Sequence, residues 1–263
     1  MRKAIGFLAA ALPALLSACA SAPESAAPAL SADASRIASG GHCESSAMLN
    51  ALLAAGYDFA EAEIVGYGAA PSFVYVPGSF PFIGTRSATM REDFFKTAGI
   101  AWEKRAPSPG QDAWAEIYET LGRGIPVMLR VDMRYLPYRY GGKYGPAYMS
   151  FGWHWVTLFK VDRRLGLAWV TDTEYEGLQE IRIKDLDKAR ASRTKVWPPN
   201  REFAWVEPAV EKRTFDRAKM VRAAATAAAS NLSGRAFESL PAGLPELERF
   251  PSIVRAFDRE LPS

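Results

Sequence analysis

The residue best suited to covalent chemistry is Cys43. It follows Gly40, Gly41 and His42 and precedes apolar residues at helical spacing, so the sequence predicts a turn that places this cysteine at the start of a helix. The backbone N–H groups and the dipole at that end of a helix favour a thiolate. A single cysteine on a helix is more often a small buried hydrophobe, so its position alone leaves both interpretations open.

A thiol nucleophile needs a neighbouring base, and the base needs a group that fixes its tautomer. His154 opens the apolar run 154–161, and Asp172 ends the run 167–172, with a polar, glycine-containing turn between them. Antiparallel pairing of these two predicted strands would bring the Asp172 carboxylate toward the imidazole. A structural histidine and a turn-capping aspartate are the alternatives, but the joint order Cys, His, Asp favours nucleophilic catalysis.

Four other residues are candidates for contact with a substrate. His42 is a second potential base beside the thiol, and Asp132, at the end of a predicted strand, either meets a cationic amine or caps a turn. Tyr135 and Tyr138 belong to an aromatic, glycine-rich segment that forms either a lid or a surface loop. The chain has two histidines, and one of its two cysteines, Cys19, is interpreted below as a lipid anchor. Two histidines and one cysteine are an unusual zinc ligand set, so we expect no metal and no cofactor.

The N-terminus has the layout of a secretory signal, with a basic start and an apolar stretch too short to span a bilayer comfortably. Residues 16–19 resemble a bacterial lipobox, which predicts a signal peptide over 1–18, a lipid anchor on Cys19 and a flexible tether over 19–35. Because residue 20 is alanine, the expected location is the outer membrane, facing the periplasm. Cys43 is then an unpaired thiol in an oxidising compartment, for which catalysis is one reason.

Composition and pattern predict an α+β protein. The 263 residues are 49% hydrophobic, enough for a substantial core, and the net charge of +3 comes without a long basic run, so we expect no nucleic-acid partner. Helical patterns come first and an antiparallel sheet follows. We expect one domain over 36–207 and a C-terminal helical region over 208–263 that packs on its sheet.

Several separated motifs resemble the N-terminal domain family of butirosin biosynthesis protein H over roughly residues 40–185. The motifs are His42-Cys43-Glu44-Ser45, Gly122-Arg123-Gly124-Ile125-Pro126-Val127, Val131-Asp132, Tyr135-Leu136-Pro137-Tyr138, His154-Trp155-Val156 and Val170-Thr171-Asp172. The C-terminal part is similar to the helical region that often follows that domain. The resemblance implies a papain-like fold and an acyltransferase, with Cys43 as nucleophile, His154 as general base and later acid, and Asp172 as the orienting carboxylate.

The resemblance also implies the partners of the reaction, an acyl donor and an amine or water acceptor. The Cys43 backbone N–H would hold part of the oxyanion, but the glutamine that papain-like proteases carry six residues earlier is Ile37 here, which leaves the second donor open. The family's best-known acyl donor is a cytoplasmic carrier protein, whereas this chain has the features of an exported one. We therefore expect an envelope amide, ester or thioester, with a catalytically silent lipoprotein that binds a peptide or protein as the alternative.

Overall fold

The computed structural model describes residues 30–76, 82–85, 87–108, 111, 114–195, 197–211, 213–234 and 242–260. The predicted signal peptide, the Cys19 anchor and the first part of the tether lie outside these residues.

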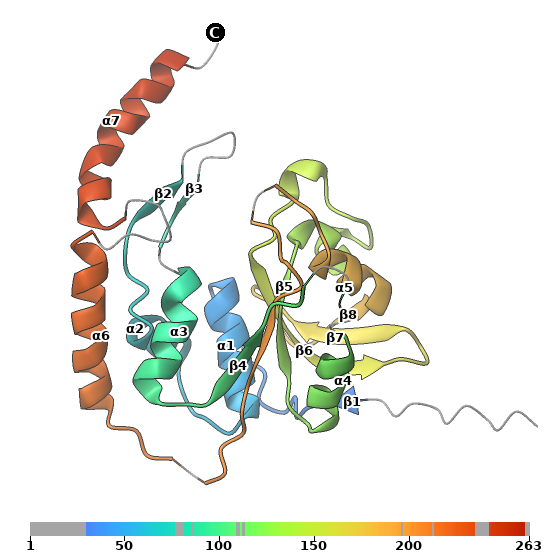
Figure 1. Cartoon of the computed structure of the whole chain (residues 1–263). Helices are drawn as coiled ribbons and strands as arrows, with labels where there is room; N and C mark the ends of the chain where they lie inside the picture. Colours follow the sequence, from blue (N-terminus) through green and yellow to red (C-terminus); the bar gives the residue numbers. More distant parts are fainter. Residues whose placement is uncertain are drawn as a thin grey trace, which may run out of the picture.

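A seven-stranded antiparallel sheet forms the centre of the described chain (Figure 1). Its order is β4-β9-β5-β6-β7-β8, and β1 pairs with β6 beside this path. The strands are β1 (Leu30–Ser31), β4 (Trp102–Arg105), β5 (Val127–Val131), β6 (His154–Asp162), β7 (Leu167–Thr171), β8 (Gln179–Arg182) and β9 (Phe203–Val206). A separate hairpin joins β2 (Val74–Val76) and β3 (Phe82–Gly84).

Helices cover both faces of the sheet (Figure 1). The helices of the described residues are α1 (Cys43–Ala54), α2 (Glu61–Tyr67), α3 (Ser87–Ala98), α4 (Trp114–Gly122), α5 (Ile183–Arg190), α6 (Arg217–Leu232) and α7 (Leu244–Glu260), with short 3-10 turns η1 (Met133–Tyr135), η2 (Pro137–Tyr140) and η3 (Ala147–Met149). Along β6, Trp155 packs into the core beneath α1 and α3, whereas Val156 packs into the core beneath α4 and α5. This alternation is the period of two of a strand buried on both faces. The α+β prediction is confirmed.

The last part of the predicted tether begins with a strand of the sheet. Leu30 and Ser31 pair with Val161 and Lys160 of β6, and the Ala32 N–H donates to Phe159 O at 2.8 Å. The longer β6 continues past Val127, the first residue of β5, and leaves backbone groups for another strand to pair with. Residues 30–32 are therefore fixed by main-chain hydrogen bonds, and the prediction of a flexible tether is wrong for them.

The C-terminal helical region was expected to pack on the sheet. Its first helix, α6, instead packs on helices α2 and α3. Its Met220 and Ala224 enter the core shared with α2 and α3, and the adjoining Phe215 ring lies 4.8 Å from that of Phe59. Helix α7 continues through Pro251, and its Phe250 contacts the rings of Phe73 and Tyr75 beside β2. Figure 1 shows α6 and α7 end to end along the side of the molecule remote from β7 and β8.

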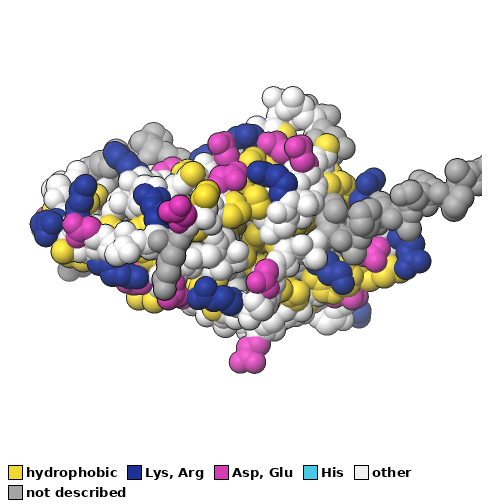
Figure 2. All heavy atoms as spheres, turned by 90° about the horizontal axis from the view of Figure 1, so that it is seen from below, with side chains coloured by type: hydrophobic (Ala, Val, Ile, Leu, Met, Phe, Trp, Pro, Cys, Tyr) yellow, Lys and Arg dark blue, Asp and Glu magenta, His cyan; other side chains and the backbone are white. Residues whose placement is uncertain are grey.

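Surface charge is mixed on the face shown in Figure 2, where lysine, arginine and acidic side chains are interspersed with apolar ones. Within the described ranges, none of the helices combines the length and the apolar character needed to cross a bilayer.

Candidate active site

Cys43 is the first residue of α1, as the sequence predicted. The preceding residue, His42, is the N-cap with extended backbone (φ −134°, ψ 136°), and its Nδ1 lies 3.5 Å from the Ser45 N–H nitrogen. The helix is tied to the sheet, because the Thr157 hydroxyl of β6 donates to the Ala47 carbonyl at 2.9 Å. Cys43 is a half-buried free thiol. The nucleophile candidate thus sits at the positive end of a helix that is anchored to β6.

His154 and Asp172 meet at the end of the sheet next to Cys43. Thr157 of β6 pairs with Thr171 of β7, so Asp172 follows β7 at the edge where β6 begins. His154 Nε2 lies 2.6 Å from Asp172 Oδ1. On the thiol side, Cys43 Sγ is 3.9 Å from the carbonyl oxygen of Trp153, the residue before His154. The structure therefore brings together all three residues that the sequence proposed as catalytic.

The Asp172 carboxylate receives hydrogen bonds from three side chains. Besides His154, Arg139 donates through Nε to Oδ2 at 2.7 Å and through Nη2 to Oδ1 at 3.1 Å, and the Tyr138 hydroxyl donates to Oδ2 at 2.9 Å. The Arg139 contact is a bidentate, charge-assisted pair, the strongest common geometry for a carboxylate. Sequence reasoning missed Arg139, although it lies inside the aromatic segment that was singled out.

The charges of His154 and Asp172 stabilise each other. Burial favours neutral Asp172, but the His154 charge, its hydrogen bond and those of Arg139 outweigh burial and hold the Asp172 pKa at about 2. Burial likewise lowers the pKa of His154, whereas the Asp172 charge and hydrogen bond, followed by contact with Cys43, raise it to about 9. The site favours an aspartate–imidazolium pair beside the thiol.

A second group of charges lies behind the nucleophile. Glu44, the residue after Cys43, is 3.4 Å from Arg91 Nη1, and Arg91 Nη2 is 2.9 Å from Glu202. Glu202 also pairs with Arg130 at 3.1 Å, and Arg130 Nε donates to the Gly152 carbonyl at 3.1 Å. These ion pairs, together with the hydrogen bond to Gly152, connect α1 with the segment that leads into β6. Burial raises the pKa of Glu44 to about 7, because Arg91 offsets only part of its cost.

Of the four predicted substrate residues, His42 lies at the site and Asp132 does not reach it. His42 is exposed, and partial desolvation lowers its pKa, Glu61 raises it and the charge of nearby His154 lowers it further. Asp132 is fully buried. Its Oδ1 accepts from the backbone N–H groups of Arg134 and Phe151, and its Oδ2 accepts from two serine hydroxyls. The suggestion that Asp132 meets an amine is wrong, because the chain itself uses both oxygens; the turn-capping alternative holds.

Both predicted tyrosines have partners within the protein. The Tyr138 hydroxyl is held by Asp172, and burial together with that charge raises its pKa well above its ordinary value. Tyr135 packs on the core beneath α4 and α5, with its ring 5.2 Å from that of Tyr144. Tyr138 therefore supports the Asp172 carboxylate, and a substrate contact by either tyrosine stays a prediction.

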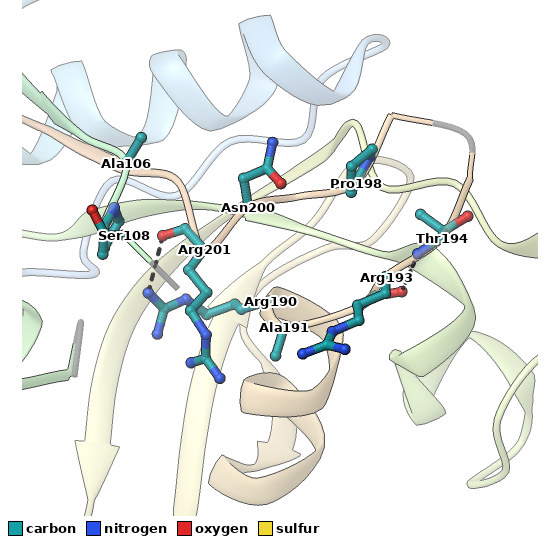
Figure 3. A pocket seen from close by; sticks show the side chains of 11 residues that line it. Ala106, Ser108, Arg190, Ala191, Arg193, Thr194, Pro198, Asn200 and Arg201 are labelled. Carbon is teal, nitrogen blue, oxygen red and sulfur yellow. Dashed lines mark hydrogen bonds between the residues drawn. The ribbon is translucent and has the colours of Figure 1, made fainter. Parts of the chain in front are cut away.

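A cavity of about 630 Å³ lies between the end of α5 and the loop that precedes β9 (Figure 3). Arg190, Arg193 and Arg201 are among its lining residues, but none of the three candidate catalytic residues is. Among the described residues, no cluster of three or more histidine, cysteine, aspartate or glutamate side chains is arranged to hold a metal ion.

The sequence profile of the family described as butirosin biosynthesis protein H, N-terminal, matches residues 42–173, about half of the chain. This range begins at His42 and ends just after Asp172, so it contains the whole candidate site. No curated protein sequence matches the chain. A crystal structure of a candidate C39-like peptidase from Bacillus anthracis is similar, with 13% identity, 68% of this chain and 98% of that chain covered, and a TM-score of 0.45.

Proposed function

Since the chain belongs to the butirosin biosynthesis protein H N-terminal family, we propose that it is a cysteine enzyme that forms an acyl-enzyme on Cys43. It would transfer the acyl group to an amine or to water, as an acyltransferase or as an amide or thioester hydrolase. The observation that carries the proposal is the 2.6 Å contact between His154 Nε2 and Asp172 Oδ1, on a ring that also interacts with Cys43. In papain-like enzymes the same three roles are required.

In the first half of the reaction, the Cys43 thiolate attacks the acyl carbonyl carbon and a C–S bond forms. The oxyanion lies near the Cys43 backbone N–H at the start of α1. His154, charged because Asp172 raises its pKa, donates its proton to the departing amine or thiol as the old bond breaks. The acyl group is left on sulfur, and His154 is left neutral.

In the second half, neutral His154 takes a proton from the attacking amine or water. The new bond to the carbonyl carbon forms, the C–S bond breaks and the thiolate returns beside the imidazolium. Asp172 keeps Nε2 of His154 as the protonated nitrogen throughout, which leaves Nδ1 to face the thiol. Metal ions and cofactors have no step in this scheme.

We place the reaction at the cell envelope, with a lipid-, peptide- or polyamine-derived amide, ester or thioester as substrate. The support is the lipobox-like stretch 16–19, whose Cys19 would carry the anchor. The test is detergent partitioning of the full-length protein from a bacterial host. Wild type should enter the detergent phase and Cys19→Ala the aqueous phase; partitioning that does not depend on Cys19 would contradict the anchor.

Mass spectrometry of the intact protein tests the chemistry. After incubation with an envelope extract and with a small thioester, wild type should carry an acyl mass shift on the peptide that contains Cys43. Cys43→Ala should carry none, and His154→Ala should be acylated at least about a hundredfold more slowly. A wild-type protein that labels no faster than free cysteine would favour the silent binding protein instead.

A further inference from the structure

Glu61, the first residue of α2, contacts the turn that carries the nucleophile at three points. Its Oε2 accepts from the Gly41 backbone N–H at 2.8 Å. Its Oε1 accepts from the His42 backbone N–H at 3.2 Å and from the Ser45 hydroxyl at 2.7 Å. These donors lie on both sides of Cys43 along the chain. One carboxylate therefore holds the approach to the nucleophile and the first turn of its helix together.

The bonded N–H groups have no alternative within α1. Gly41 and His42 precede the first helical residue, so their N–H groups are outside the i to i−4 pattern and need another acceptor. Upstream, the buried Asn50 side chain accepts from the Ala38 N–H and donates to the Ala38 carbonyl, both at 3.0 Å. The segment is thus fixed at residue 38 by Asn50 and at residues 41 and 42 by Glu61.

Gly40 provides the space that this arrangement needs. A Cβ at position 40 would lie 2.7 Å from Glu61 Oε1 and 2.7 Å from Ser46 Cβ, closer than Cβ atoms approach. A Cβ at position 41 would meet Glu61 Oε2 at an ordinary 3.9 Å. Only the first of the two glycines is required for the carboxylate to reach the turn.

We propose that Glu61 is a positioning residue for the reaction above: its carboxylate fixes the Gly41–His42 turn and thereby directs Cys43 toward His154. The proposal rests on the proposed function for its consequence, though not for its geometry. None of these contacts joins Glu61 to the Cys43 thiol or to the His154 ring. Glu61 therefore acts through the backbone that carries Cys43.

Alkylation of Cys43 by iodoacetamide at two pH values separates positioning from a structural role. At pH 6 a free thiol is mostly protonated, so fast alkylation requires the imidazolium beside it. We expect Glu61→Ala to slow alkylation about 10- to 100-fold at pH 6 and to leave the rate unchanged at pH 10, a pH at which ordinary thiols are ionised. Glu61→Gln, which keeps one acceptor oxygen, should lie between Glu61→Ala and wild type. An unchanged rate at pH 6, or an equal loss at both pH values with a lowered melting temperature, would overturn the proposal.

A matched control comes from the same helix. Glu63 accepts from the Ala60 N–H and pairs with Arg217, so Glu63→Gln perturbs α2 without touching the nucleophile turn. It should leave the rate at pH 6 within about twofold of wild type. If Glu63→Gln slowed alkylation as much as Glu61→Ala, the effect would belong to the stability of α2 and the proposal would fail.

The glycine pair gives a second test that leaves Glu61 in place. Gly40→Ala should displace the carboxylate and slow alkylation at pH 6 as Glu61→Ala does, whereas Gly41→Ala should not. Equal rates for both variants would contradict the role of Gly40 in the arrangement.

Amide hydrogen exchange distinguishes failure of this proposal from failure of the proposed function. Exchange of a peptide that spans residues 40–43 should accelerate in Glu61→Ala, whatever the thiol does. If exchange accelerates while alkylation stays fast, the carboxylate orders the turn without positioning the thiol, and the proposal is wrong. If the wild-type protein is alkylated no faster than free cysteine and His154→Ala does not change that rate, the proposed function is wrong. The role of Glu61 in that function is then wrong as well.

Discussion

Asp172 and Glu44 are both buried carboxylates next to the candidate nucleophile, yet the protein surrounds them in opposite ways. Asp172 is 4% exposed and accepts four hydrogen bonds from His154, Arg139 and Tyr138. Glu44 is 1% exposed, and among the described residues neither of its oxygens has a hydrogen-bond partner. Its nearest cation, Arg91, is 3.4 Å away. The pKa is about 2 for Asp172 and about 7 for Glu44.

The difference shows that directed donors, rather than depth, decide whether a buried acid ionises here. Arg139 points both donors at Asp172, whereas Arg91 gives its closest contact to Glu202 at 2.9 Å and lies 4.2 Å from the centre of the Trp155 ring. The side of the candidate site that holds Asp172 thus keeps its carboxylate ionised. Behind the nucleophile, ionisation of the buried Glu44 carboxylate is energetically unfavourable near neutral pH.

The largest effect expected from this comparison is on catalysis. Asp172→Asn removes the charge that keeps His154 protonated and allows the wrong tautomer, so acylation of Cys43 by a thioester should fall about 10³- to 10⁴-fold. Glu44→Gln should change the rate less than about threefold. Stopped-time mass spectrometry of the acyl adduct measures both, with circular dichroism to confirm folding. Comparable losses in the two variants would mean that the two carboxylates act as one unit.

The pH dependence of the acylation rate and of stability should follow from the pKa values of His154 and Asp172. The His154 pKa is raised from 6.5 to about 9, so the acylation rate that depends on the imidazolium should decline as pH rises through about 9. The stability that the imidazolium contributes should be complete below pH 6.5 and should be lost between pH 6.5 and about 9. The Asp172 pKa is lowered from 3.8 to about 2, so the stability that its charge contributes should be complete above pH 3.8 and should be lost as pH falls from 3.8 through about 2. In Asp172→Asn the alkaline decline should move toward pH 6.5. An alkaline limb at the same pH in both proteins would show that Asp172 does not set the charge of His154.

That the three candidate catalytic residues lie together could be predicted because their signals are local. A glycine turn before a helix marks Cys43, and the two apolar runs joined by a short turn place His154 and Asp172 at one sheet edge. The order of helices and strands likewise follows from local patterns, which is why the α+β fold class could be predicted from the sequence.

Contacts between distant segments could not be predicted in this way. Arg139 reaches Asp172 across 33 positions and Glu61 reaches His42 across 19, with no periodicity that links them. The position of Asp132 at the end of a predicted strand left an amine contact and a turn cap both open. Two serines, one of them 60 positions away, donate to one of its oxygens. The pairing of residues 30–32 with β6 depends on the unequal lengths of β5 and β6, which short patterns do not reveal.

Replacement of Glu44 by glutamine should stabilise the protein in a pH-dependent way. Because the folded protein holds a proton that the unfolded chain releases between pH 4.5 and about 7, stability falls as pH rises through that window. Glu44→Gln removes this term and should raise the free energy of unfolding by about 1–3 kcal/mol at pH 8, with little change at pH 4. Urea denaturation at both pH values measures it, with Glu180→Gln on the exposed side of β8 as control. Destabilisation at pH 8 would show that Arg91 depends on an ionised Glu44.

The smallest expected effect on stability concerns Lys104, which lies at the solvent-exposed end of the group of charges behind the nucleophile. Lys104 Nζ pairs with Glu92 at 2.8 Å and comes within 4.0 Å of Glu202, but the two side chains of the shorter pair are 43% and 36% exposed. Water already solvates such a pair, so Lys104→Met should lower the free energy of unfolding by less than about 1 kcal/mol, and 1 M salt should remove most of that difference. Urea denaturation at low and high salt measures both. A larger, salt-resistant loss would mean that Lys104 supports the buried ion pairs through Glu202, and that the charges behind the nucleophile act cooperatively.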